Sequence, residues 1–207
     1  MLLVVLVVAQ LVLPGIAEQQ LRDRLAHSGQ VEHVEIHAFP AIELLWNQAD
    51  RVVVRMVSYH SGTGHLAGLL GEAGDVDTLD ASAGTLTAGL LTVHDAALRK
   101  RGDQVTATAR VTEADLRSAL PVLQSVVPVA SGGGELTVRG TASLFGLTAT
   151  VDATVHTQNG QIVVTPDVPF GGFATITVFS NPAVFVTGVS AVPTADGFFV
   201  TAQGRIK

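Results

Sequence analysis

The chain has 207 residues, a formal net charge of −6, no cysteine, 14% charged residues and a mean hydropathy of +0.43. This length suits one domain with a real core or two very small ones, and the surplus of small apolar residues is typical of a β-rich protein. The missing cysteine excludes disulfides, thiolate metal sites and a cysteine nucleophile. The negative charge argues against a nucleic-acid partner and against electrostatic attachment of the whole chain to anionic lipid.

The first thirteen residues form an apolar stretch that is interrupted only by Gln10. We treat residues 1–13 as a hydrophobic N-terminal anchor or helix. Thirteen helical residues rise about 20 Å, which is shorter than the roughly 30 Å hydrocarbon core of a bilayer. Two interpretations stay open: the stretch ends a longer transmembrane or signal segment that begins upstream, or it is a buried core helix.

An amphipathic helix is predicted directly after this stretch. Ala17, Leu21 and Leu25 recur every four residues and therefore share one stripe of a helix, and Gly29 stands where helices tend to end. Pro14 either begins this second helix or kinks a continuous one. The strands that follow must then cover the apolar stripe.

Two strands around a short helix are predicted next. Apolar and polar residues alternate over 33–38, which predicts a half-buried strand that ends at Phe39-Pro40. Residues 41–48 predict a short helix, and residues 50–59 predict a second strand with apolar residues on both faces.

A glycine-rich segment follows this second strand. The spacing Gly62-x-Gly64-x-x-x-Gly68 resembles a dinucleotide-binding loop, with Asp75 and Asp77 downstream. These acidic residues come too early for that motif, and the glycines weaken the helix that it requires. We therefore expect a loop with one short helical turn.

The rest of the chain alternates strands with tight turns. A hairpin is predicted around Arg101-Gly102-Asp103, with a return strand over 104–111, and Thr112-Glu-Ala-Asp115 resembles a capping box that starts a short helix. Asn159-Gly160 is the strongest hairpin signal. In all, we expect about ten strands and three or four helices, with one β-rich domain over residues 14–207.

Catalytic chemistry is sparse in this sequence. The seven histidines are scattered; His33 and His37 would lie roughly 13 Å apart on one strand face, while His60 and His65 flank a loop and could meet. There is no G-x-S-x-G motif and no clear pair of carboxylates. We therefore expect neither an enzyme nor a metal or cofactor.

The inward faces of the predicted strands carry small side chains. These are Ala107, Ala109, Ala149, Ala153, Ala174 and Ala202. Such a sheet either packs very close to a helix or leaves volume for a long apolar ligand, and periodicity alone favours neither alternative.

Three stretches, residues 31–56, 79–121 and 184–207, carry a resemblance to a known family. The motifs are the turn Ala38-Phe39-Pro40 after a strand, the hairpin at 101–103 and the helix start at 112–116, behind a hydrophobic N-terminal segment. Their order and spacing resemble the LmeA-like family of actinobacterial cell-envelope phospholipid-binding proteins over about residues 16–206. Ala38 replaces the glycine of the family's turn, so that turn is expected to be less sharp.

The resemblance implies a non-enzymatic protein at the outer (periplasmic) face of the plasma membrane, N-terminally anchored or secreted. It would bind phospholipid or another acyl lipid and support envelope lipid or glycan assembly. The implied fold is α+β: a curved antiparallel sheet wrapped around a long N-terminal helix, like tubular lipid-binding domains, with a few short helices.

Two other hypotheses compete with lipid binding. One is a membrane-tethered structural or protein-interaction module without a ligand, and the other is an enzyme, either nucleotide-dependent through Gly62–Gly68 or hydrolytic. For the lipid-binding hypothesis we expect contacts from large apolar residues, each of which is also a common core residue: Phe39, Leu45, Trp46, Leu69, Leu70, Phe145, Phe173 and Phe185.

Overall fold

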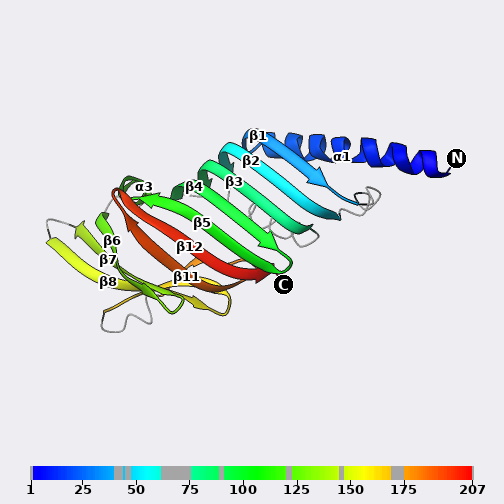
Figure 1. Ribbon diagram of the computed structural model, residues 1–207. Coiled ribbons are helices and arrows are strands. Elements are labelled where there is room, and N and C mark those ends of the chain that lie inside the picture. Colours follow the sequence, from blue (N-terminus) through cyan, green and yellow to red (C-terminus); the bar gives the residue numbers. More distant parts are fainter. Residues whose placement is uncertain are drawn as a thin grey trace.

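The computed structural model consists of two β-sheets, a long N-terminal helix and a short helix near the place where the sheets meet (Figure 1). It describes residues 2–39, 44, 48–61, 76–88, 91–119, 123–144, 147–168 and 175–206. Within these ranges there are twelve strands and two α-helices, so the structure has more strands than the sequence patterns predict. The predicted helix over 41–48 and the glycine-rich segment after residue 61 lie largely outside the described residues.

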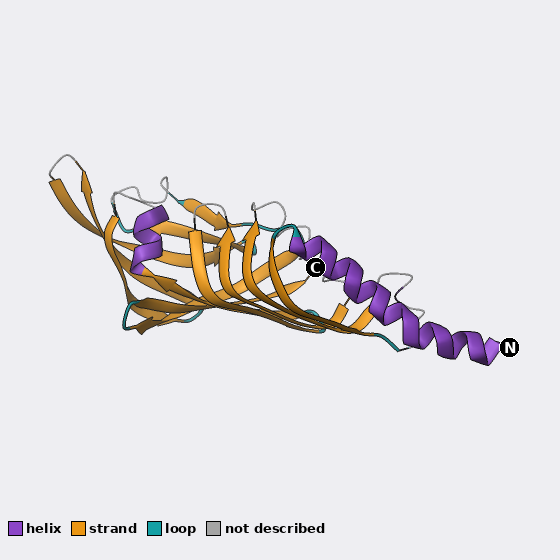
Figure 2. Cartoon of the chain, turned by 90° about the horizontal axis from the view of Figure 1, so that it is seen from above, coloured by secondary structure: helices purple, strands orange, loops and turns teal. Residues whose placement is uncertain are grey.

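Helix α1 (Leu2–Ala26) runs without a break through Pro14, so the proline does not begin a second helix. The predicted stripe is confirmed: Leu25 is buried in a cluster with strand residues, and Ala17 and Leu21 pack against that cluster. Figures 1 and 2 show the N-terminal half of α1 extending beyond the sheet. The described contacts thus cover the C-terminal half of the helix, and a sheet wrapped along its whole length is not shown.

The larger sheet has seven strands in the order β1-β2-β3-β4-β5-β12-β11. Their bounds are Gly29–His37 (β1), Ala49–Ser61 (β2), Val76–Ala88 (β3), Leu91–Arg101 (β4), Gln104–Thr112 (β5), Gly197–Ile206 (β12) and Val184–Thr194 (β11). The expectation of a wholly antiparallel sheet is wrong at one place, because β2 and β3 are parallel. Residues 62–75 separate these two strands in the sequence. Fourteen residues are enough for the crossover connection that two parallel strands require.

The smaller sheet has five antiparallel strands in the order β10-β9-β8-β7-β6. Their bounds are Leu123–Gly132 (β6), Glu135–Leu144 (β7), Leu147–Gln158 (β8), Gln161–Pro166 (β9) and Ile176–Phe179 (β10). The predicted turn between β8 and β9 is confirmed, because Asn159 and Gly160 both have positive φ, 52° and 78°. These angles give the turn the twist of its two strands.

The two sheets meet along β11, the outer strand of the larger sheet. Its backbone amides at Val186 and Val189 donate hydrogen bonds of 3.0 Å to the carbonyl oxygens of Gly160 and Gly134. These glycines lie in the β8–β9 and β6–β7 turns, so the hairpin tips of the smaller sheet satisfy groups that an edge strand would otherwise expose. Helix α3 (Glu113–Ala119) contacts β4, β5 and β6 and therefore links the two sheets.

Candidate functional site

The inner face of the larger sheet is apolar from one edge to the other. One register row places a single apolar side chain on each of the seven strands: Val34, Val54, Ala81, Leu98, Ala107, Ala202 and Val189. Residues that are directly opposite in neighbouring strands point to the same face. The alternation that the sequence shows is thus assembled into a continuous apolar surface.

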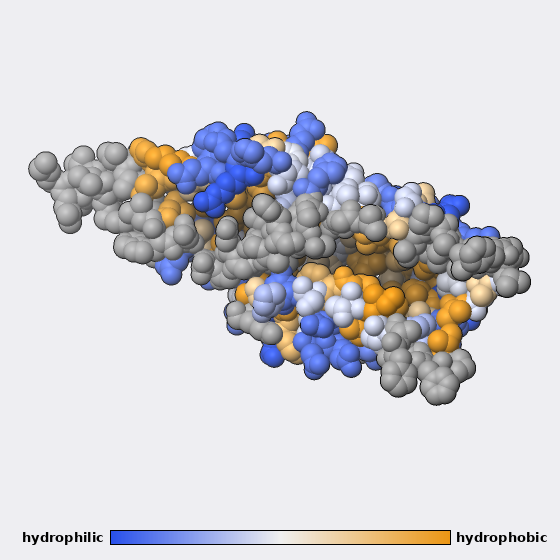
Figure 3. All heavy atoms as spheres, turned by 180° about the vertical axis from the view of Figure 1, so that it is seen from behind, coloured by the Kyte–Doolittle hydropathy of each residue, from blue (hydrophilic) through white to orange (hydrophobic). Residues whose placement is uncertain are grey.

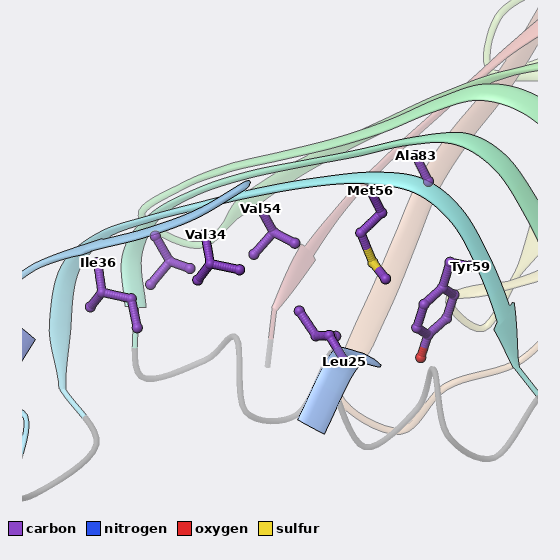
Figure 4. Close-up of a cluster of buried hydrophobic side chains, with 8 residues drawn as sticks. Leu25, Val34, Ile36, Val54, Met56, Tyr59 and Ala83 are labelled. Carbon is purple, nitrogen blue, oxygen red and sulfur yellow. The ribbon is translucent and has the colours of Figure 1, made fainter. Parts of the chain in front are cut away.

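Both ends of this row are covered. At the β1 end, Val34 is 2% exposed in a cluster that includes Leu25 of α1 (Figure 4). At the β11 end, Val189 is 4% exposed in a second cluster that also contains Leu136 of the smaller sheet. The helix and the smaller sheet therefore each close one end of the inner face.

The middle of the row is only half covered. Leu98, Ala107 and Ala202 are partly exposed, and they belong to neither cluster of the described core. Figure 3, which views the molecule from behind, shows hydrophobic surface gathered in a hollow. We call Leu98, Ala107 and Ala202 the apolar strip. At the β1 end the small side chains are packed closely, because Leu25 of α1 is buried with residues of β1 and β2, whereas the apolar strip is only partly buried and a ligand there stays a prediction.

Ala109 and Ala149, which are also predicted to point inward, differ from Ala107 and Ala202 in their surroundings. Ala109 packs against the second cluster, as expected for an inner-face residue. Ala149, near the start of β8, is exposed. Ala174 lies outside the described residues.

Lys100 is a buried cation beside this apolar surface. It lies on β4 two residues after Leu98, between Leu79 and Val105 in register, and is 3% exposed. Its ammonium donates a hydrogen bond to the carbonyl oxygen of Val76. A buried ammonium is costly unless polar groups compensate it, and the Val76 carbonyl is one such group. Lys100 therefore supplies a strong hydrogen-bond donor near the strand ends, at the edge of the apolar face.

Tyr59 is a second polar group on the inner side. Its side chain is 4% exposed within the cluster that contains Leu25, and its hydroxyl has no hydrogen-bond partner among the described residues. Figure 4 shows the hydroxyl directed away from the sheet. An unpaired buried hydroxyl usually indicates a polar group or water that completes the site.

A small polar network holds α3 at the junction of the sheets. The Nε2 atom of His94 on β4 lies 3.0 Å from Oδ2 of Asp115, which also accepts a hydrogen bond from the Thr112 hydroxyl. The Asp115 amide donates back to Thr112 Oγ1 at 3.2 Å, so the predicted start of this helix is confirmed. Burial raises the pKa of Asp115, but the Thr112 hydrogen bond and the nearby His94 outweigh it and leave that pKa below its ordinary value.

Most of the residues expected to contact a ligand lie outside the described residues: Leu45, Trp46, Leu69, Leu70, Phe145 and Phe173. Phe39 is 78% exposed just after β1, where its amide donates to Asp50. Phe185 is half-buried, packs over Gly160, and has the Arg205 guanidinium 5.1 Å from its ring centroid. Neither phenylalanine belongs to the apolar strip, and ligand contact by any of the eight residues stays a prediction.

Sequence reasoning missed Leu98, Tyr59 and Lys100. Leu98 and Lys100 are two residues apart, which places them on one face of a strand, and this spacing was the available signal. The adjacent arginines concealed it, because the run Arg99-Lys100-Arg101 looks like one solvated charge cluster.

Neither a metal cluster nor a helix that could cross a bilayer is found in the part of the chain that the structure describes. Its histidines, aspartates and glutamates form no group of three that could hold a metal ion. His33 and His37 instead flank Glu35, at 3.6 and 3.4 Å from its carboxylate oxygens. In these same ranges, no helix combines the length and hydrophobicity that a membrane span requires.

An apolar surface bordered by one cation suits an amphiphilic ligand with a long apolar part, and comparison with known proteins agrees with this. The model of the LmeA-like phospholipid-binding family matches residues 6–195. The chain belongs to this family. The match covers most of the chain and confirms the resemblance that its motifs carry.

Other comparisons add little to the family assignment. No curated protein is significantly similar to the chain. Among solved structures, a fragment of the STAR-related lipid transfer protein from Xanthomonas axonopodis shares 14% identity and a TM-score of 0.21, over 55% of this chain and 76% of that one. A TM-score this low carries no argument about the fold or the ligand.

Proposed function

We propose that the protein binds phospholipid, with acyl chains lying against the apolar strip, and that it does so without catalysing a reaction. The observation that carries this proposal is the half-covered row Leu98-Ala107-Ala202 between two closed clusters, in a chain that belongs to a phospholipid-binding family. From Ala81 to Ala202 the row crosses four strands, or about 14 Å at the usual strand spacing. This length suits an extended acyl chain better than a compact metabolite.

The energetic basis of such binding is hydrophobic. Each methylene moved from water onto an apolar surface contributes about 0.8 kcal/mol when fully buried. Small side chains such as Ala107 and Ala202 leave volume for the chain, whereas larger ones would fill the hollow themselves. We propose that the ammonium of Lys100, which also donates to the Val76 carbonyl, meets the phosphate of the lipid, because lysine offers a compact charge with several donors.

The N-terminal half of α1 is the part that we assign to the membrane. Residues 2–13 are almost wholly apolar and rise about 18 Å as a helix. Figures 1 and 2 show this half extending away from both sheets, and a bilayer is the environment that so apolar a sequence favours. We assign the protein to the cell envelope at the outer face of the plasma membrane, where it holds or shuttles lipid for envelope lipid or glycan assembly.

The test is native mass spectrometry on the full chain, released from membranes and followed by lipid extraction. Stoichiometric phospholipid that accompanies the protein is the expected result. A bare polypeptide mass that stays bare after incubation with phospholipid vesicles would contradict the proposal.

A second candidate function is a tethered interaction module without a ligand. It is favoured by the outermost strand of the smaller sheet, β10, where Ile176 and Val178 are 63% and 56% exposed. Exposed apolar edge strands readily pair with another chain. Sedimentation of the full chain at several concentrations, in detergent, tests this: a concentration-dependent dimer supports it, and a constant monomer argues against self-association.

A further inference from the structure

The outer face of the larger sheet carries a row of arginines at the end of its strands. This row follows the register from His37 on β1 to Phe185 on β11 and contains Arg51, Arg101 and Arg205. The three arginines lie on β2, β4 and β12, so neighbouring members are two strands, or about 10 Å, apart. We call these three residues the arginine row.

Carboxylates on this face neutralise only part of the positive charge. Arg101 makes two 3.1 Å hydrogen bonds to Asp80, while Arg51 and Arg99 also approach the same carboxylate at 3.6 and 4.0 Å. One carboxylate cannot balance three guanidinium groups. The side chains of Arg51 and Arg101 are 56% and 55% exposed, so their remaining donors are within reach of an external anion.

Two further cations extend the basic surface. Arg205 is exposed beyond the Asp80 network, and Arg55 faces His33 across the β1–β2 pair. Glu35 also lies on this part of the outer face and Asp103 lies in the turn just after Arg101, which leaves five arginines against three acidic groups. Two other strand-end acids, Asp50 and Asp77, occupy the alternate positions that belong to the inner side of the sheet.

This concentration of positive charge contrasts with the whole chain, whose formal net charge is −6. The acidic residues must therefore lie mainly elsewhere, and net charge is a poor guide to this face. Exposed arginines attract anionic phosphates, each contributing about fivefold in affinity for an anionic lipid surface.

The position of the row relative to α1 indicates its partner. In Figure 1 the arrowheads of β1 and β4, which end at His37 and Arg101, point toward the side from which the N-terminal half of α1 projects. A bilayer that takes up this half of the helix would therefore approach the strand ends that carry the arginine row.

We infer that the arginine row docks the larger sheet onto the anionic headgroups of the bilayer that α1 enters. This inference rests on the proposed function, because it takes the helix to be inserted in a membrane. Docking here also places Lys100, one residue before Arg101 and on the opposite face, close to the headgroup layer. Lipid could then pass between the bilayer and the apolar strip with a short path for its phosphate.

The experiment compares binding of the full chain to two kinds of vesicle by co-flotation. One kind is phosphatidylcholine, and the other is an equal mixture of phosphatidylcholine and phosphatidylglycerol. The apolar helix contributes to both, so the ratio of the two affinities isolates the electrostatic part. The test variant is Arg51→Gln/Arg101→Gln/Arg205→Gln, and the matched control is Arg110→Gln/Arg117→Gln/Arg139→Gln, which removes the same charge from positions away from this strand end.

The wild type should prefer the anionic vesicles, and added salt should weaken this preference. In the test variant, the ratio of the affinity for anionic vesicles to the affinity for phosphatidylcholine vesicles should fall on the order of 100-fold. In the control variant, this ratio should stay within a few-fold of the wild-type value. Equal binding of the wild type to both vesicles would overturn the inference. So would an equal loss in both variants, because the effect would then follow net charge and not this face.

Two further measurements separate folding and lipid content from docking. The variant Arg55→Gln/Arg205→Gln leaves the Asp80 network intact. Its ratio of affinities for anionic and phosphatidylcholine vesicles should still fall tenfold or more. Bound phospholipid is extracted from every variant. A wild type that prefers anionic vesicles but carries no phospholipid would contradict the proposed function and still support docking by the arginine row. A wild type that carries phospholipid but shows no preference for anionic vesicles would support the proposed function and overturn the docking.

Discussion

Leu98 on β4 lies directly opposite Ala107 on β5, and both side chains stay partly exposed on the inner face of a sheet whose two ends are buried. A folded chain usually covers such a surface with its own side chains. Here the described helix and the smaller sheet each cover one end, and the apolar strip between them is the surface that we propose as the lipid site.

Filling the apolar strip should displace lipid. Ala107→Phe adds a large side chain where an acyl chain is proposed to lie, and the loss of about two methylene contacts corresponds to roughly tenfold weaker binding. The matched control is Thr108→Phe, which adds the same ring to the outer face of the same strand. Quantified lipid extraction from the purified variants is the measurement, and unchanged lipid content in Ala107→Phe would place the acyl chains elsewhere.

Lys100 should matter for the phosphate and much less for the acyl chains. Lys100→Met keeps the length of the side chain but removes its charge. We expect phospholipid binding to weaken about tenfold, as for a lost charge-assisted hydrogen bond, while binding of a phosphate-free diacylglycerol changes little. Competition between the two lipids, followed by mass spectrometry, measures both effects. Equal loss for both lipids would indicate a packing role for Lys100.

The hydroxyl of Tyr59 should contribute nothing to the stability of the lipid-free protein. It is buried without a partner among the described residues, so Tyr59→Phe should leave the free energy of unfolding unchanged or raise it by up to about 1 kcal/mol. Tyr59→Ala is the comparison and should cost about 3–5 kcal/mol through the cavity that it leaves. Urea unfolding of delipidated protein tests this, and a loss above 1 kcal/mol in Tyr59→Phe would reveal a hidden partner.

Acid should loosen the attachment of α3. Because the pKa of Asp115 in the folded protein is lower than its ordinary value of 3.8, its carboxylate stabilises the fold above that value, and this contribution is lost as the pH falls through the folded pKa. Between about pH 5 and about pH 3, Asp115→Asn should therefore lose less stability than the wild type does. Asp167→Asn, at an exposed position, serves as the control and should follow the wild type. Identical pH profiles for Asp115→Asn and the wild type would contradict this role.

The cap of α3 gives a complementary test that does not depend on acid. Thr112→Ala removes the hydroxyl that accepts from the Asp115 amide, and it should cost about 1 kcal/mol at neutral pH. Thr112→Ser keeps the hydroxyl and should recover most of that loss. Chemical denaturation measures both variants, and equal stability of Thr112→Ala and the wild type would show that the cap is not needed.

Local patterns in the sequence were sufficient for the elements that depend on neighbouring residues. The stripe of Ala17, Leu21 and Leu25, the turn at Asn159-Gly160 and the capped start of α3 follow from helical period, turn chemistry and capping. The family could also be recognised, because the order and spacing of short motifs survive in the linear sequence. The inward positions of Ala107 and Ala202 follow from strand alternation in the same way.

Tertiary structure decided everything that depends on which strands become neighbours. The parallel pairing of β2 with β3 and the insertion of β12 between β5 and β11 have no local signal, since they join residues far apart in the chain. That strand order brings Arg51, Arg101 and Arg205 into one row, although the net charge had argued against a basic surface. It also sets Lys100 beside the apolar strip. Pleat alternation assigns each side chain to a face, but only long-range register determines what that face contains.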